Sequence, residues 1–176
     1  MKKVILFILI LGLVGALYGC GGTPKTATPT ENPPLPKGDE ELLKKAKMGN
    51  VMTMSDNWDE DAEDDGIVVY PSLEDENGET IKFENVEIPV DIEIYTSKYD
   101  KDFNKVEPRL IYKGKSKITS WKDGNFMFNG GIRIPWEDIK TVEKDSDIGV
   151  LYVHMHLPDG RTISAKDDAT RIKPEE

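Results

Sequence analysis

The chain has 176 residues, of which 38% are hydrophobic and 32% charged, and its 33 acidic side chains outnumber its 23 basic ones. This length suits one domain of ordinary size with an appendage, and hardly two domains. The net charge of −10 argues against nucleic acid as a partner, because phosphate binding needs a basic face. The single cysteine excludes an internal disulfide framework and a thiolate-rich metal site.

Residues 1–19 have the pattern of a secretory signal peptide. Lys2 and Lys3 are basic, and residues 4–18 form an unbroken run of apolar and small side chains. A membrane span needs about 20 such residues, so this run is too short for a comfortable transmembrane helix. A bare transmembrane anchor is the alternative interpretation, but glycine and proline after a short run favour the signal peptide.

The end of this run resembles the lipobox of prokaryotic lipoproteins, through Leu17, Tyr18, Gly19 and Cys20. The resemblance implies cleavage after Gly19 and a thioether-linked lipid on Cys20, which would anchor the protein to the extracytoplasmic side of the cell membrane. The mature chain would carry 21 bases against 33 acids, a formal charge of −12. Anionic headgroups repel such a body, so the lipid would have to supply the adhesion.

A tether and a short helix are predicted to follow the lipid attachment site. Residues 20–38 include five prolines and four threonines, a composition that favours an extended, semi-rigid tether. Residues 39–50 predict a short helix over about 40–48, with Asp39 as the N-cap and Gly49 just beyond the last turn. A helix of this length is marginal unless it packs on a domain.

From residue 51 onwards the hydrophobic pattern has a period of two, which predicts an antiparallel immunoglobulin-like β-sandwich over residues 51–172. The clearest alternation is in residues 89–95 and 150–157, where apolar side chains take one face and polar side chains the other. Turn signals separate the predicted strands, which are residues 51–54, 67–73, 80–88, 89–95, 109–112, 116–121, 126–128, 132–136, 150–157 and 161–165.

Four stretches of this region resemble a loose family of prokaryotic cell-envelope β-sandwich domains. They are an acidic loop ending in Asp-Gly before a strand (59–70), a turn (73–78), a strand (90–95), and a late strand with a Pro-Asp-Gly-Arg turn (151–161). The resemblance implies an immunoglobulin-like or transthyretin-like fold with no known activity. It carries over no catalytic residues.

Residues 56–65 contain seven acids and no base, and a divalent cation would relieve their mutual repulsion. Part of the spacing matches a calcium-binding loop, although its twelfth position is Ser72 instead of glutamate. The alternative, a solvated acidic loop, is favoured because no helices flank the segment. The candidate calcium ligands are Asp59, Asp61, Glu63 and Asp65.

Histidines and aromatic residues give two weaker candidate sites. His154 and His156 share one strand face and could chelate a metal, but an exposed polar face is the favoured interpretation. Seven aromatic side chains could line a carbohydrate or peptide surface, although core and rim packing is their more common use. They are Trp58, Trp121, Trp136, Tyr70, Tyr95, Tyr112 and Tyr152.

The chain lacks the G-x-S-x-G, H-E-x-x-H and P-loop motifs, so we expect no enzyme, no catalytic residues and no resident cofactor apart from the candidate calcium. The favoured hypothesis is a membrane-anchored, non-catalytic binding or structural module of the cell envelope with an unidentified protein or glycan partner. Two alternatives stay open: a calcium-dependent adhesion or scaffold domain, and an accessory subunit of a membrane transport or enzyme complex.

Overall fold

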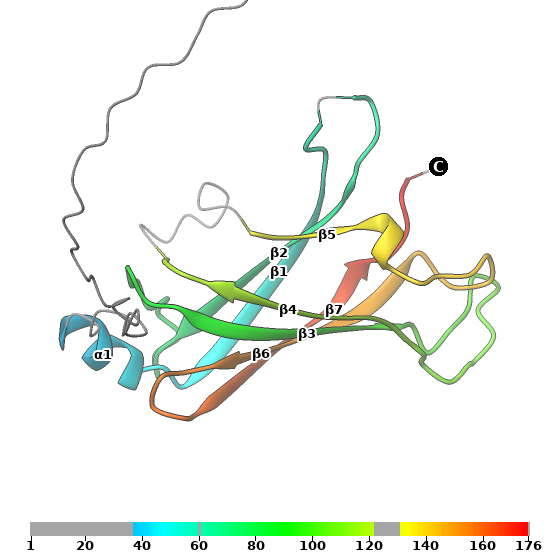
Figure 1. The fold of residues 1–176 in the computed structure, drawn as a ribbon. Coiled ribbons are helices and arrows are strands. Elements are labelled where there is room, and N and C mark those ends of the chain that lie inside the picture. The colour runs from blue at the N-terminus through cyan, green and yellow to red at the C-terminus, as the bar shows by residue number, and fades with distance from the viewer. Residues whose placement is uncertain (1–36, 60, 122–130, 176) are drawn as a thin grey trace, which may run out of the picture. The chain divides into compact units, whose positions relative to one another are not determined.

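The computed structural model describes residues 37–59, 61–121 and 131–175, which form two antiparallel sheets and short helical segments (Figure 1). One sheet has the order β1-β2-β5 and consists of β1 (Met48–Asp56), β2 (Gly66–Glu74) and β5 (Ile132–Pro135). The other has the order β4-β3-β6-β7 and consists of β3 (Ile88–Thr96), β4 (Leu110–Ile118), β6 (Ile148–His156) and β7 (Thr162–Arg171). The predicted all-β sandwich is therefore confirmed.

The strand order matches that of an immunoglobulin domain except at the fourth strand. In the constant-type immunoglobulin domain, strands 1, 2, 5 and 4 form one sheet and strands 3, 6 and 7 the other. Here the fourth strand pairs with the third instead, which gives sheets of three and four strands. The edge strands β1 and β7 meet where Thr53 Oγ1 donates to Asp167 Oδ2 at 2.6 Å. Gly49 permits this approach, because a Cβ there would lie 3.0 Å from the Cγ2 methyl of Ile163 in β7.

The core lies between the sheets and follows the alternation of the sequence. In β3, every second residue is buried and the residues between them face outwards. Each fully buried aliphatic side chain contributes about 1.5–3 kcal/mol to folding. The largest fully buried side chains come from both sheets and their flanking segments: Ile67, Leu73, Ile88, Ile92, Ile94, Ile134, Leu151, Met155 and Ile172.

The segment predicted as a strand at residues 80–88 is a strand only at its end. Before β3 it forms two isolated bridges, from Glu74 to Thr80 and from Phe83 to Trp121. Phe83 is buried, but Asn85 has a left-handed backbone (φ 58°) that interrupts the pleat. In this segment, burial of alternate side chains is therefore not sufficient evidence for a regular strand.

The strands predicted on either side of Gly114 are one continuous strand, β4. The sequence suggested a break because glycine commonly marks turns. In the structure Gly114 pairs with Ile92 of β3, and the ring of Tyr112 occupies the space that a Cβ at Gly114 would need. This glycine thus provides room for a neighbouring aromatic ring within the sheet.

The helix α1 (Lys37–Lys44) begins and ends earlier than predicted, and β1 starts at Met48 within the segment 39–50 assigned to the helix. Leu43 and Ala46 are buried, and the Lys47 N–H donates to the Glu74 carbonyl at 2.9 Å. Pairing with β2 therefore draws the chain into the sheet before the helical pattern of the sequence is complete.

Arg161, in the turn between β6 and β7, holds the end of α1 in place. Its guanidinium donates to the carbonyl of Ala46 at 2.6 Å and to that of Leu43 at 2.9 Å. The carboxylate of Asp159 accepts from Arg161 Nε at 2.7 Å, and this hydrogen bond lowers the pKa of Asp159. A cation at a helix C-terminus satisfies carbonyls that lack partners within the helix.

Several predicted features lie outside the described residues: the signal peptide at 1–19, the lipid attachment site Cys20, the tether as far as residue 36, and the hairpin at 122–128. Residues 37–38, assigned to the tether, begin α1. In the part of the chain that the structure describes, no helix combines the length and apolar character that crossing a membrane requires.

We predict that Arg161→Ala lowers the free energy of unfolding by about 2 kcal/mol, because it leaves the last carbonyls of α1 without their charged donor. Chemical denaturation measures this loss, and faster amide exchange at Ala46 would locate it. Arg171→Ala is the control, since among the described residues the Arg171 side chain forms a surface ion pair with Glu175, and its loss should change stability by less than about 1 kcal/mol. Equal effects of the two variants would contradict the capping role.

Candidate functional site

A hollow of about 540 Å³ lies on the outer face of the four-stranded sheet. Tyr95 of β3 and Tyr152 of β6 line it from the sheet, and residues 97–99 with Pro108 line it from the β3–β4 loop. β3 and β6 pair so that Glu93 lies opposite Tyr152. Because side chains alternate along a strand, this register gathers outward-facing residues of both strands in one place.

The two tyrosine rings are fixed by their contacts. Their centroids are 5.8 Å apart with an interplanar angle of 87°, which is an edge-to-face arrangement. Tyr95 Oη donates to Glu93 Oε2 at 3.0 Å, and Lys166 Nζ lies 5.8 Å from the centroid of the Tyr152 ring. A site with preformed rings loses little conformational entropy when a ligand binds.

Neighbouring groups set the charges around the hollow. Lys113 Nζ donates to Glu93 Oε1 at 2.8 Å, and this bond, followed by the one from Tyr95, lowers the pKa of Glu93. The same Glu93 carboxylate raises the pKa of Tyr95. At neutral pH the hollow therefore contains an ionised Glu93 and a neutral Tyr95. On the other side, an ion pair with Asp168 raises the pKa of Lys166.

The two histidines share a face, as predicted, but they have separate partners. His154 Nδ1 lies 2.7 Å from Ser164 Oγ, and His154 lines the hollow. His156 Nε2 lies 2.8 Å from Asp91 Oδ2, and this contact is the main cause of the lowered pKa of Asp91. Within residues 37–59, 61–121 and 131–175, no three His, Cys, Asp or Glu side chains form a group that could hold a metal ion.

The acidic loop connects β1 to β2, and three of its four candidate calcium ligands accept hydrogen bonds from the loop's own backbone. Asp65 Oδ2 accepts from the Trp58 N–H at 2.7 Å, and Asp61 Oδ1 accepts from the Glu63 N–H at 2.8 Å. Asp59 Oδ1 accepts from the Asp61 N–H at 3.1 Å. These carboxylates thereby shape the loop. Calcium binding by the loop stays a prediction.

Two tryptophans connect this loop to the first sheet. The Arg133 guanidinium lies over the ring of Trp58, 5.2 Å from its centroid. Trp136, in the short 3₁₀ helix η2 (Trp136–Asp138), donates its Nε1–H to the Asp64 carbonyl at 2.8 Å. Both tryptophans therefore position the loop, and neither lines the hollow.

Only two of the seven aromatic candidates, Tyr95 and Tyr152, line the hollow; Trp121 is buried, and Tyr70 and Tyr112 pack against the core. Sequence reasoning missed Tyr99, Lys166 and the loop residues of the site. Their proximity depends on which strands pair, and nothing in the local sequence pattern indicates that pairing.

We found no match to the chain among protein-family models, curated protein sequences or solved structures. The resemblance to cell-envelope domains therefore stays a prediction. What the described residues define is an all-β sandwich with a preformed, tyrosine-lined hollow on one sheet face.

The acidic loop gives a testable prediction about calcium. A site of extracellular type would have a dissociation constant of roughly 10⁻⁴–10⁻³ M, so 10 mM calcium would stabilise the fold by about 1.4–2.7 kcal/mol. Thermal unfolding in calcium, compared with sodium at matched ionic strength, measures this gain. The double variant Asp61→Asn with Asp65→Asn should abolish it. Equal melting temperatures in the two salts would identify a charged loop without a calcium site.

Proposed function

We propose that this protein is a lipid-anchored, extracytoplasmic binding module of the cell envelope without catalytic activity. The observation that carries the proposal is the preformed hollow with Tyr95 and Tyr152 on an exposed sheet face. The signal-peptide pattern and Cys20 at its end support the lipid-anchored, extracytoplasmic location.

The chemistry of the hollow favours a ligand with both flat apolar and polar surface, such as a glycan or an extended peptide. Tyrosine rings offer apolar faces for packing, and their hydroxyls and nearby ionised groups offer hydrogen bonds. The volume of about 540 Å³ lies within the usual range for small-ligand sites. Paired charges at Glu93–Lys113 and Lys166–Asp168 suit a ligand with little net charge.

A binding role is favoured over catalysis by the surroundings of the His154–Ser164 pair. A nucleophile and a base within hydrogen-bond distance also need a group that orients the base. In the described residues, no hydrogen bond to His154 Nε2 is present, and Ser164 lies on an exposed strand position. Within the described residues, no third group orients His154 as a catalytic constellation would need.

The anchor is tested by Cys20→Ser. We expect this variant to lose lipid attachment and therefore to leave the membrane fraction, or to keep an uncleaved signal peptide. Membrane fractionation and the mass of the mature N-terminus measure both effects, with wild type as the reference. Normal processing together with full membrane retention would rule out the lipid anchor.

The hollow is tested by titrating the soluble form, which lacks residues 1–19 and carries Cys20→Ser, with soluble peptidoglycan fragments and with proline-rich peptides. One of these classes should shift the amide NMR signals of Tyr95, Tyr152 and His154. Tyr152→Ala should weaken that binding about tenfold, because it removes a fixed aromatic surface. Lys117→Ala, on the same sheet outside the hollow, should bind as wild type does. Unshifted signals with both classes would argue against the hollow as their site.

A further inference from the structure

Strand β4 has a partner strand on only one of its two long sides in the described part of the chain. It is the edge strand of the four-stranded sheet, next to β3. On the β3 side Pro89 lies opposite Lys117, and proline has no N–H to donate. The hydrogen-bonded pairs are therefore those that flank Lys117, and they recur at every second residue. The N–H and C=O groups of Lys113, Lys115 and Lys117 consequently point away from β3, and we call this row of backbone groups the free edge.

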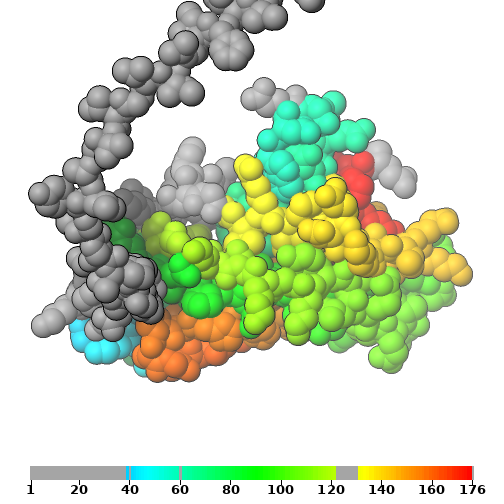
Figure 2. All heavy atoms as spheres, viewed as in Figure 1, coloured from blue at the N-terminus to red at the C-terminus, as the bar shows by residue number. Residues whose placement is uncertain are grey.

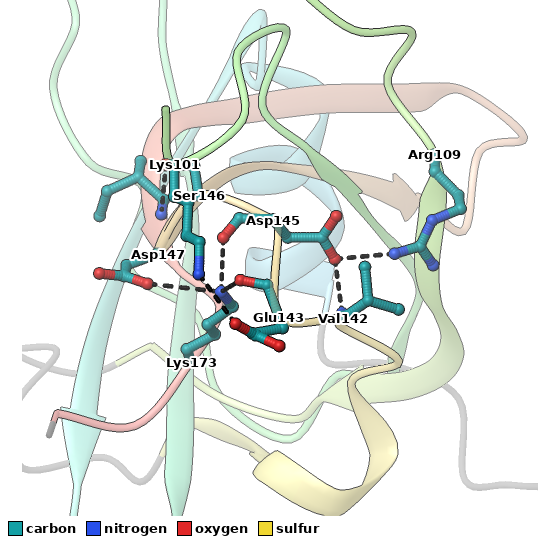
Figure 3. A network of polar contacts seen from close by, with 9 residues as sticks. Lys101, Arg109, Val142, Glu143, Asp145, Ser146, Asp147 and Lys173 are labelled. Carbon is teal, nitrogen blue, oxygen red and sulfur yellow. Dashed lines mark hydrogen bonds and ion pairs between the residues drawn. The ribbon is translucent and has the colours of Figure 1, made fainter. Parts of the chain in front are cut away.

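The start of β4 is covered on this side, and the free edge lies beyond the cover. The Lys140 N–H donates to the Ile111 carbonyl at 2.9 Å. Arg109 holds this segment in place, because its guanidinium donates to the Lys140 carbonyl at 2.9 Å and lies 2.7 Å from the carboxylate of Asp145 (Figure 3). In the part of the chain that the structure describes, no hydrogen bond reaches the backbone groups of the free edge. They are thus available to a further strand.

The space beside the free edge lies next to the core. β4 and β5 are the edge strands of the two sheets and do not pair, and a separate hollow of about 340 Å³ is lined by residues of both. In the space-filling view, the atoms of β4 lie at the surface near those of β5 and the segment that follows it (Figure 2). Tyr112 and Ile118 of β4 and Ile132 of β5 pack against the core but remain partly exposed. An added strand would cover them.

The outward side chains of β4 favour an acidic strand as the partner. They are lysines, and each has a carboxylate on its β3 side at 2.7–3.6 Å: Glu93 for Lys113, Asp91 for Lys115 and Glu87 for Lys117. β3 therefore already pairs with β4 through buried apolar residues and outward acids. An ammonium group has three N–H donors, so each lysine can bind a second carboxylate on the side of the free edge.

We propose that the free edge binds an extended segment of a partner protein in which apolar residues alternate with acidic ones. The segment adds a strand to the sheet, with its acids beside the lysines and its apolar residues near Tyr112 and Ile118. A second copy of β4 is disfavoured, because its lysines would lie opposite these lysines, and like charges opposite each other destabilise a strand pair. This inference goes beyond the proposed function and depends neither on the tyrosine-lined hollow nor on its ligand.

The test uses a synthetic peptide with the sequence of residues 90–96, in which Asp91 and Glu93 alternate with apolar residues. The protein is the soluble form that lacks residues 1–19 and carries Cys20→Ser. We expect the amide hydrogens of Lys113, Lys115 and Lys117 to exchange rapidly in the free protein and roughly tenfold more slowly with the peptide bound. A control peptide with both acids replaced by lysine should bind about tenfold more weakly.

Several results of this titration would overturn the proposal. Slow exchange of the three amide hydrogens in the free monomer would show that the chain itself covers the edge. Slow exchange in a dimer alone would identify a second copy as the occupant. Equal affinities for the two peptides would exclude charge recognition, and absence of binding would exclude strand addition.

The variant Lys115→Pro separates strand addition from folding. The Lys115 N–H does not serve the β3–β4 ladder, so the variant should keep the amide NMR signals of β3 and β6 and melt only a few degrees lower. Peptide binding should fall about tenfold, because the central donor of the free edge is lost. Lys105→Ala, in the β3–β4 loop, should bind as wild type does. An unfolded Lys115→Pro variant, or a folded one with unchanged binding, would overturn the proposal.

Discussion

The pairing of β3 with β6 is the constraint on which both the core and the candidate site depend. Their inward residues meet across the register at Ile92 and Val153, deep in the core. The same register places Glu93 opposite Tyr152 on the outer face. A slip by one residue would reverse both faces, because side chains alternate with a period of two. The hydrophobic core thereby fixes the geometry of a surface site that it does not touch.

In this acidic protein, charged side chains organise the loops and the helix end that lie next to them. The carboxylates of Asp61 and Asp100 accept backbone N–H groups and shape two exposed loops. Arg161 and Arg109 act at opposite ends of the sandwich, the first on the carbonyls of α1 and the second on Asp145. Exposed ion pairs contribute little each, so the organising effect comes from the side chains that also bind backbone groups.

The two ends of the described fold are built from different contacts. At one end, Arg161 fixes the helix through which the chain enters the sheet. At the other, braced loops present Phe103 and part of the tyrosine-lined hollow.

The sequence by itself determined the all-β class, the position of most strands and the face that each one buries, because alternation of apolar residues is a local property. It could not distinguish the buried segment 80–87 from a strand, or Gly114 from a turn, because both depend on backbone partners in other strands. Tyr95 and Tyr152 were candidates among seven aromatic residues, but only the β3–β6 register joined them. The capping by Arg161 was likewise decided by tertiary structure, since it results from contacts between segments distant in the sequence.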